Sequence, residues 1–308
     1  MNFEYVKFCL ATYISEKCQL SCSYCGDKNR TIPVNQEQVE CTIEESLSIK
    51  NIREYCFTGY GEPLMEMGFL EKLVKKIRKT KKDADLYLMT NGIKFNELSD
   101  NEIIKFLKNF KVVSISVSNE RYRVLNGVGI KAVKKIIKLK KEKKVHPEIE
   151  IIFVNDGVSD KTIKGIYNSL MVPSFSYKKY KIWTPEDDKA SRCRFDTIFY
   201  ETIIANGLNI LFDGQAFLPC CSFETEKMYP LVDMEEVRYM REKGINATQE
   251  AVDRYEKLAE MFMTVDRKLS GKRAKIYDKG CAHCKKVGAE YREKQMQKQA
   301  QKQAILIK

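Results

Sequence analysis

The sequence predicts an α/β protein built around a parallel β-sheet, arranged as a six-unit partial barrel or as a doubly wound sheet. Apolar strand-like segments alternate with amphipathic helical segments over the first 185 residues, which is typical of parallel strands joined by helical crossovers. Stretches that carry Cys, Gly and Asn follow these apolar segments, where such sheets place their functional residues. About 185 residues are too few for an eight-unit barrel.

Apolar runs and helical spacing define the elements of this first region. The strands are expected at 5–14, 53–63, 86–92, 111–119, 149–156 and 176–184. The helices are expected at 36–50, 67–80, 99–110, 130–144 and 159–169. The second strand breaks at Gly59, and the third ends in the turn dipeptide Asn91-Gly92. Ser99 followed by Glu102 predicts a capping box at the start of the third helix.

The pattern changes after Pro185. Residues 202–221 read as a β-hairpin with Asn-Gly and Asp-Gly turns, and helices are expected at 233–243 and 248–268. A CAHC motif and a polar tail follow. We therefore divide the chain into a first domain at 1–185, a small α+β extension at 186–290 and a tail at 291–308. The first strand starts close to Met1, so no separate peptide-recognition domain is expected before the sheet.

Composition favours a soluble, cytoplasmic protein. Charged residues make up 31% of the chain and no apolar run is long enough to span a membrane. The N-terminus has no cleavage site of the kind that follows a signal peptide. Eleven cysteines in such a chain point to metal binding or reactivity before disulfides. The net charge of +12 is spread over many helices, which favours a solvated lysine-rich surface over a nucleic-acid site.

Three cysteines in the stretch KCQLSCSYCGDKN form the strongest local signal. Cys18, Cys22 and Cys25 follow the first strand directly. A structural zinc site normally needs four ligands, and neither histidine of the chain is near in sequence. Three thiolates on a four-iron cluster would instead leave one iron open for a small molecule. The aromatic Tyr24 stands just before Cys25.

This stretch resembles the CxxxCxΦC motif of the radical S-adenosylmethionine (radical SAM) enzymes, in which Φ is aromatic. A second segment, FTGYGEPLM, resembles the GGEP motif of that family. The inserted Tyr60 departs from the family pattern, while the Gly-Glu-Pro core is kept. TNG at 90–92 and SISVSN at 114–119 match the third and fourth strands of the family. The resemblance covers about residues 5–185 and implies a partial (βα)6 TIM-like barrel.

The resemblance also implies a cofactor site. In the family, the backbone and carboxylate of the second motif bind the methionine amino group, and Ser116 would be the ribose contact. The cofactor-binding residues implied here are Tyr24, Gly59, Tyr60, Gly61, Glu62, Pro63, Asn91, Ser116 and Asn155. A 4Fe-4S cluster on the three cysteines would bind S-adenosylmethionine, and its reductive cleavage would give a 5′-deoxyadenosyl radical that abstracts a hydrogen. An external one-electron reductant of the flavodoxin or ferredoxin type is implied.

A second cysteine set lies in the extension. It resembles the twitch module, related to the longer SPASM extension, of some radical SAM enzymes, a hairpin plus helix that holds one auxiliary 4Fe-4S cluster. The implied ligands are Cys193, Cys220, Cys281 and Cys284. Zinc on the same thiols is an open alternative. The fifth cysteine, Cys221, is either a packed small residue or a thiol that donates a hydrogen atom to a substrate radical. Which of Cys220 and Cys221 is the cluster ligand stays open.

Three functions remain open. The first is a peptide-modifying radical SAM enzyme, with an epimerase that uses Cys221 as one form of it. The second is a dehydrogenase of a small alcohol or of a Ser or Cys side chain, with the auxiliary cluster as electron acceptor. The third is a non-enzymatic metal protein that binds nucleic acid, in which the Gly-Glu-Pro segment would have no role. Cys9, Cys41 and Cys56 are expected to be core or strand residues without a chemical role.

Overall fold

The computed structural model describes the chain in several segments. These are residues 8–20, 22, 34–58, 61–117, 128–155, 176–181, 207–210, 216–217, 230–232, 234–254 and 256. The chain divides into two compact units. One consists of Lys7–Ile182 and Ile210–Gly214, and the other of Met1–Val6, Trp183–Asn209 and Gln215–Lys308. Among the described residues, no helix is long and apolar enough to cross a membrane.

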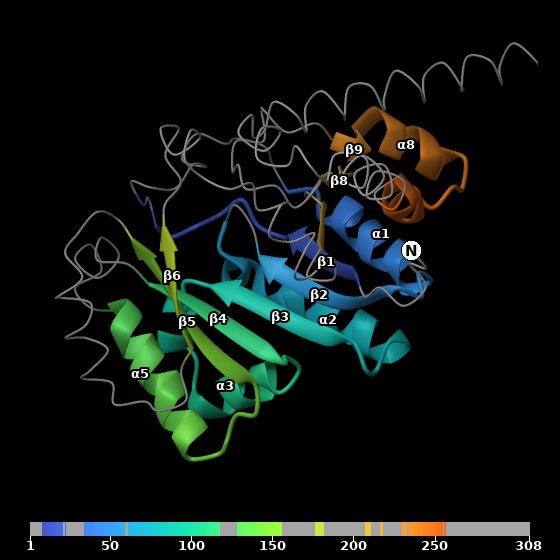
Figure 1. Cartoon of the computed structure of the whole chain (residues 1–308). Coiled ribbons are helices and arrows are strands. Elements are labelled where there is room, and N and C mark those ends of the chain that lie inside the picture. Colours follow the sequence, from blue (N-terminus) through green and yellow to red (C-terminus); the bar gives the residue numbers. More distant parts are fainter. Residues whose placement is uncertain are drawn as a thin grey trace, which may run out of the picture. The chain divides into compact units, whose positions relative to one another are not determined.

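The larger unit contains a parallel sheet whose strands follow one another in chain order. All five pairings between neighbouring strands are parallel (Figure 1). The strands are β1 (Phe8–Tyr13), β2 (Ile52–Thr58), β3 (Asp85–Thr90), β4 (Val112–Val117), β5 (Glu148–Asn155) and β6 (Ser176–Lys181). The α/β class and the parallel sheet expected from the sequence are confirmed.

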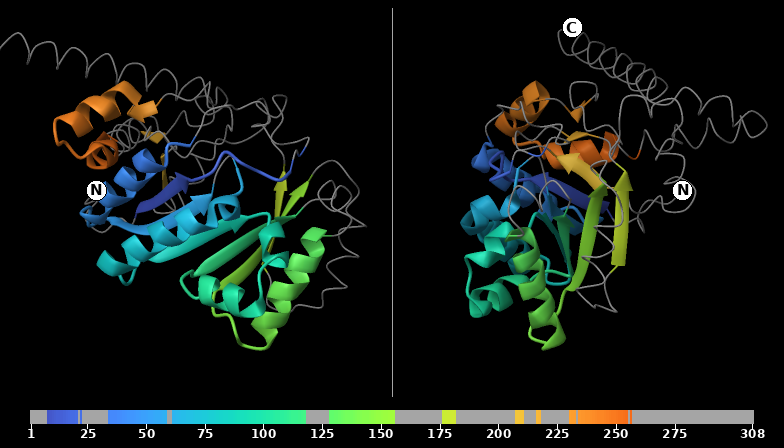
Figure 2. Two further views of the ribbon diagram at one scale, coloured as in Figure 1. Left: turned by 180° about the vertical axis from the view of Figure 1, so that it is seen from behind. Right: turned by 90° about the vertical axis from the view of Figure 1, so that its left-hand side faces the viewer.

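Helices connect these strands and lie on one face of the sheet (Figures 1 and 2). They are α1 (Gln36–Leu47), α2 (Met67–Thr80), α3 (Asp100–Leu107) and α5 (Val128–Lys141). Two short 3-10 turns, η2 (Pro63–Glu66) and η3 (Ile93–Asn96), follow β2 and β3. The helix expected at 159–169 lies outside the described residues.

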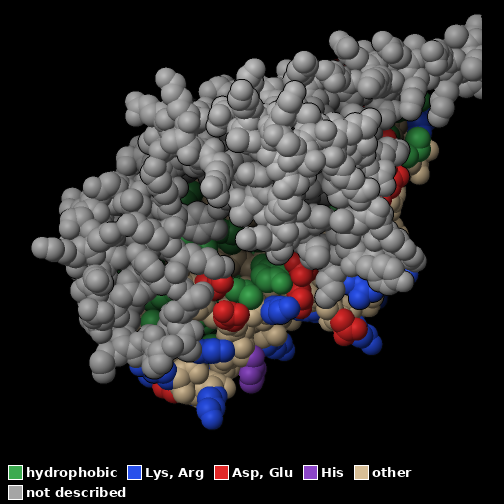
Figure 3. Space-filling view, viewed as in Figure 1, with side chains coloured by type: hydrophobic (Ala, Val, Ile, Leu, Met, Phe, Trp, Pro, Cys, Tyr) green, Lys and Arg blue, Asp and Glu red, His purple; other side chains and the backbone are tan. Residues whose placement is uncertain are grey.

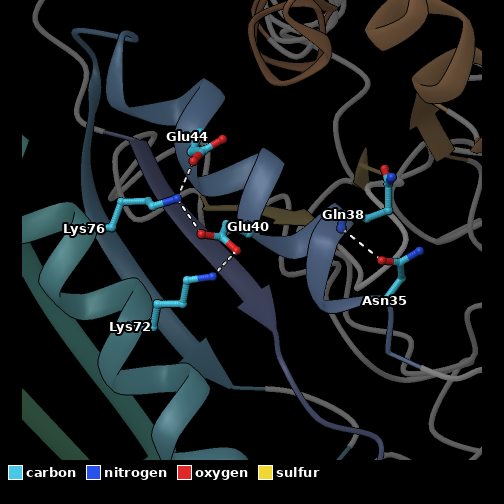
Figure 4. Close-up of polar contacts among 6 residues, drawn as sticks. All are labelled: Asn35, Gln38, Glu40, Glu44, Lys72 and Lys76. Carbon is cyan, nitrogen blue, oxygen red and sulfur yellow. Dashed lines mark hydrogen bonds and ion pairs between the residues drawn. The ribbon is translucent and has the colours of Figure 1, made fainter.

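Helices α1 and α3 begin at side chains that cap their first turns. Ser99 accepts a hydrogen bond from the backbone N–H of Glu102, whose carboxylate accepts from the Ser99 N–H, so the predicted capping box is present. Asn35 caps α1 by accepting from the Gln38 N–H at 3.1 Å (Figure 4). These caps satisfy backbone donors that have no partner inside the helix.

The core fills the space between the sheet and the helices. Tyr55 and Phe57 on β2 are fully buried, and the Tyr55 hydroxyl lies 3.1 Å from the Ser46 hydroxyl of α1. Leu86 pairs with Tyr55, and Leu88 pairs with Phe57, so these side chains point to the same face. The alternate positions of the strands form the opposite face. On β2 and β3, the alternate apolar residues therefore mark the face of the sheet that the helices cover.

Ion pairs join α1 to α2 on their exposed surfaces. Glu40 accepts from Lys72 at 2.6 Å and from Lys76 at 2.5 Å, and Lys76 also pairs with Glu44 (Figure 4). In the described part of the face shown in Figure 3, lysine and arginine side chains are interspersed with carboxylates. This distribution agrees with the expected solvated surface.

The second unit is described only in short segments. Strands β8 (Ala216–Phe217) and β9 (Pro230–Val232) pair antiparallel. Strand β7 (Gly207–Ile210) and β8 both fall within the segment for which a hairpin was expected. Helix α8 (Met234–Glu242) corresponds to the helix expected at 233–243, and residues 247–254 are helical. The expected tail at 291–308 lies outside the described residues.

Candidate cofactor site at the carboxyl ends of the strands

The functional motifs follow the carboxyl ends of neighbouring strands. β1 ends at Tyr13, β2 at Thr58 and β3 at Thr90, and these strands are adjacent and parallel. The loops that leave them therefore meet at one edge of the sheet, the usual position of a ligand site in such folds. Cys18, Glu62 and Asn91 belong to these three loops and interact with one another through the contacts described below.

Two of the three motif cysteines are described. Cys18 is exposed and Cys22 is buried, with 6% of its surface accessible, and neither forms a disulfide. Cys25 and Tyr24 lie outside the described residues. The chain enters this loop through Glu16, whose carboxylate accepts from the Val34 N–H at 2.9 Å. This hydrogen bond joins the start of the cysteine loop to its end.

Gly61 fits against the backbone that leads into the cysteine loop. A Cβ atom at this position would lie 2.7 Å from the Lys17 carbonyl oxygen and closer still to that of Ser15. The next residue, Glu62, donates its N–H to the Lys17 carbonyl at 2.7 Å. Only glycine allows this approach. The Gly-Glu-Pro segment therefore holds the backbone immediately before Cys18.

The Glu62 carboxylate is buried, with 2% of the residue exposed. One oxygen accepts from the Thr90 hydroxyl at 2.5 Å and from the Leu64 N–H at 3.0 Å, and the other accepts from the Asn91 N–H at 2.7 Å. A buried carboxylate needs such donors to offset its lost hydration. The side chain is thus engaged by the end of β3 and the start of η2.

Asn91 links this carboxylate to the cysteine loop. Its side-chain Oδ1 accepts from the Ile93 N–H at 3.0 Å. Its Nδ2 lies 3.8 Å from Cys18 Sγ and 3.3 Å from the Gln19 side-chain oxygen, within donating distance of both. The Leu20 N–H also donates to Cys18 Sγ, at 3.4 Å. N–H donors around a sulfur suit a thiolate or a cluster-bound sulfur.

The remaining predicted cofactor residues are only partly described. Pro63 begins η2 and is buried. Ser116, near the end of β4, donates to the Thr90 carbonyl at 3.4 Å. Asn155 is the last residue of β5. Gly59 and Tyr60 lie outside the described residues, as do the extension cysteines Cys193, Cys220, Cys221, Cys281 and Cys284.

The turn after β3 has the backbone conformation that its sequence predicts. Gly92 has φ of 75°, and its N–H donates to the Thr90 hydroxyl at 2.9 Å. A Cβ atom at position 92 would also lie only 2.9 Å from Cγ2 of Ile115. The glycine is therefore required both for the left-handed conformation and for the close packing against β4.

Two strand cysteines lie away from this edge, on the face of the sheet opposite the helices. Burial raises the pKa of the Cys56 thiol to about 12. Burial, followed by the nearby Cys56 and Glu54, raises the pKa of Cys9 well above its ordinary value. Both thiols are protonated near neutral pH, which suits the structural role expected for them.

Sequence reasoning missed the residues that support the motifs. Glu16 and Gln19 carry no motif signal, because their partners are a backbone N–H eighteen residues away and the Asn91 side chain in the loop after β3. Thr90 was noted only as part of the TNG segment, although its hydroxyl joins Glu62 to Gly92. The position of Thr90 at the end of an apolar strand, next to a turn dipeptide, is the one signal that could have identified it.

Known proteins resemble this chain in both sequence and fold. The model of the radical SAM superfamily matches residues 12–170. A GTP 3′,8-cyclase of Clostridium perfringens (strain SM101 / Type A) is 30% identical over 129 residues, which are 38% of this chain and 37% of the relative. A probable GTP 3′,8-cyclase of Methanococcus aeolicus is 28% identical over 163 residues, which are 51% of this chain and 52% of the relative. The chain thus spans only a third to a half of the length of these relatives.

A solved structure described as "Native anSMEcpe with bound AdoMet and Cp18Cys peptide" has a similar fold. Its TM-score is 0.53 at 19% sequence identity, and the similarity covers 82% of this chain and 83% of that one. The same protein with bound AdoMet alone gives the same TM-score and identity. At this identity the likeness shows the fold.

Proposed function

Because the chain belongs to the radical SAM superfamily, we propose that it cleaves S-adenosylmethionine reductively and uses the resulting 5′-deoxyadenosyl radical to abstract a hydrogen from a peptide substrate. The observation that carries this proposal is the junction of three motifs at one edge of the sheet. There, Cys18 receives N–H donors from Leu20 and Asn91, and the backbone before it is held by Gly61 and Glu62.

The residues present fit an iron-sulfur cluster. Cys18 and Cys22 are outside any disulfide, and the donors around Cys18 suit an anionic sulfur. We propose that Cys18, Cys22 and Cys25 hold a 4Fe-4S cluster. When bound, this cluster would supply an open iron for the amino and carboxylate groups of S-adenosylmethionine, and the electron that cleaves this cofactor. The cluster would receive that electron from an external flavodoxin- or ferredoxin-type reductant.

The chain itself would position these groups. Gly61 and Glu62 fix the start of the cysteine loop. The Glu16 carboxylate joins the two ends of this loop by accepting a hydrogen bond from the Val34 N–H. The Glu62 carboxylate already has donors from its own chain, so we assign contacts with the methionine amino group to the backbone of the Gly-Glu-Pro segment. Ser116 and Asn155, near the ends of β4 and β5, remain proposed cofactor contacts on the same edge.

A peptide substrate is supported by the fold similarity to a protein that was solved with AdoMet and a peptide. We propose that the extension is a twitch-like module in which Cys193, Cys220, Cys281 and Cys284 hold an auxiliary 4Fe-4S cluster. Cys221 would then donate its S–H hydrogen to the substrate carbon radical. The thiyl radical left on sulfur would take one electron and one proton, with the electron again drawn from the external reductant. The net result is inversion of the carbon without oxidation.

Anaerobic reconstitution tests the cofactor assignment. The two clusters predict about eight irons per chain. Cys18→Ala should lose about half of that iron and all formation of 5′-deoxyadenosine from S-adenosylmethionine and dithionite. Cys41→Ala, on α1, is the matched control and should keep both. If unaltered protein with a full iron content forms no 5′-deoxyadenosine, the proposed function is wrong.

Solvent deuterium tests the epimerase step. Product made in heavy water should carry one deuterium at the inverted carbon, because the Cys221 thiol exchanges with solvent. Cys221→Ala should still form 5′-deoxyadenosine while losing the inverted product. Full turnover in this variant would exclude Cys221 as the donor, and a dehydrated or oxidised product would instead identify the dehydrogenase reaction.

A further inference from the structure

We propose that Asn91 is a positioning residue for the cluster, in which its carboxamide donates an N–H···S hydrogen bond to Cys18 and stabilises the reduced state of the bound cluster. This inference rests on the proposed function, because it takes Cys18 as an iron ligand. It assigns Asn91 to the cluster sulfur, in place of the cofactor contact expected from the sequence.

The orientation of the Asn91 side chain follows from its own hydrogen bonds. An amide carries an acceptor at one end and donors at the other. The Ile93 N–H lies 3.0 Å from Oδ1, which requires the acceptor at that end. The donor end, Nδ2, is therefore the one that faces Cys18 Sγ at 3.8 Å and the Gln19 oxygen at 3.3 Å. With two N–H bonds, Nδ2 can serve both partners.

A buried network holds Asn91 in this position. Only 5% of Asn91 is exposed, and its backbone N–H donates to Glu62 at 2.7 Å. Glu62 is tied in turn to Thr90 through its carboxylate and to the Lys17 carbonyl through its N–H. Both ends of the Asn91–Cys18 contact are thus attached to the same carboxylate-bearing residue, which limits their relative motion.

Reduction of a cluster adds negative charge that is shared by its sulfur ligands. An N–H dipole aimed at one of these sulfurs stabilises the reduced form more than the oxidised form. Loss of this donor should therefore make the cluster harder to reduce. The Leu20 N–H donates to the same sulfur from the backbone and would remain in any side-chain variant of Asn91.

Asn91→Ser is the most direct test. Serine can still accept from the Ile93 N–H, but its side chain is too short to reach Cys18. The matched control is Asn96→Ser, because Asn96 also donates an amide N–H within the same turn, to the Ile93 carbonyl at 3.1 Å. The readout is redox titration of the reconstituted full chain, followed by the electron paramagnetic resonance signal that is absent from Cys22→Ala.

Without added S-adenosylmethionine, Asn91→Ser should lower the ratio of reduced to oxidised cluster at a fixed potential by about threefold to tenfold. Asn96→Ser should leave the ratio unchanged. Asn91→Asp keeps the acceptor for the Ile93 N–H and places a carboxylate beside the sulfur, so it should lower the ratio further. This variant replaces Asn91→Ser as the test if the serine variant does not fold. An unchanged ratio in the folded Asn91 variants would overturn the inference.

Three further outcomes distinguish this inference from a direct cofactor contact and from failure of the proposed function. If Asn91→Ser keeps the ratio but weakens binding of S-adenosylmethionine to the oxidised cluster, Asn91 contacts the cofactor directly and the inference is wrong. If unaltered protein takes up iron and forms 5′-deoxyadenosine while the Asn91 variants titrate as it does, the inference fails and the proposed function stands. Unaltered protein that binds no cluster would overturn both.

Discussion

At the scale of single residues, the site depends on groups that hold the cysteine loop as much as on the cysteines. Gly61 allows the Gly-Glu-Pro segment to contact the backbone of residues 15–17. The Glu62 carboxylate accepts hydrogen bonds from the Thr90 hydroxyl and the Asn91 N–H at the end of β3. Both residues were identified from the sequence as part of a motif. Their partners were not, because a motif shows which residues matter and not which backbone atoms they meet.

Gly61→Ala should destabilise the protein by about 1–3 kcal/mol, because the new methyl group overlaps fixed backbone atoms. Iron uptake by the three-cysteine loop should fall with it. Urea unfolding and iron analysis measure the two effects. Gly68→Ala is the control, since a Cβ atom there meets nothing within 4 Å and α2 should gain up to about 1 kcal/mol. Equal stability of the two variants would show that the loop can yield at Gly61.

The buried Cys56 thiol predicts a loss of stability at alkaline pH. The pKa of this thiol is raised from 9.0 to about 12 in the folded protein. Its contribution to folding stability is therefore complete below pH 9 and is lost as the pH rises toward 12. By pH 10 the loss of unfolding free energy should be on the order of 1 kcal/mol. Denaturant unfolding of the metal-free protein at pH 7 and pH 10 measures it. Cys56→Ala should show a smaller decrease over this interval, and an identical decrease would contradict the assignment.

At the scale of elements, the sequence predicted most of what the structure describes in the larger unit. Each described strand and helix falls within or close to its expected range, because apolar alternation and caps such as Ser99 are local signals. The 3-10 turns η2 and η3 were not predicted, since four residues are too short to show a period. Contacts between elements were also beyond the sequence, because they depend on residues far apart in the chain.

Lys81 is one such contact. Its ammonium donates to the carbonyls of Ser46, Ile49 and Ile52, at 2.9, 2.6 and 2.5 Å, and so ties the end of α2 to the turn between α1 and β2. Burial, then the nearby positive charge of Arg53, lowers the pKa of Lys81 to about 8. The side chain is therefore still mostly charged at pH 7, with three N–H bonds for three acceptors.

Lys81→Met should cost about 2–3 kcal/mol at pH 7, because it removes a charged donor from three partly buried carbonyls, of which those of Ser46 and Ile49 keep a backbone N–H donor. Lys79→Met, at an exposed position in the last turn of α2, is the control and should change stability by less than about 0.5 kcal/mol. Chemical denaturation of both variants gives the comparison. Equal unfolding midpoints would mean that water replaces the Lys81 ammonium without loss.

At the scale of the whole molecule, the chain belongs to the radical SAM superfamily, and the reaction that it catalyses is a proposal. The superfamily match covers residues 12–170, which contain the cysteine loop, the Gly-Glu-Pro segment and strands β2 to β5. The cysteines of the extension were interpreted from their resemblance to the twitch module and lie outside the described residues. The motifs of the first domain concern the proposed cofactor site and carry no signal for a particular substrate.

The most direct test of the central claim is the formation of 5′-deoxyadenosine. Reconstituted protein with S-adenosylmethionine and dithionite, under anaerobic conditions, should produce 5′-deoxyadenosine and methionine in equal amounts, measured by chromatography with mass detection. Cys18→Ala should produce neither, while Cys41→Ala should match the unaltered protein. Equal product from Cys18→Ala and unaltered protein, or none from a fully loaded unaltered protein, would contradict the assignment of this edge of the sheet as the site of radical formation.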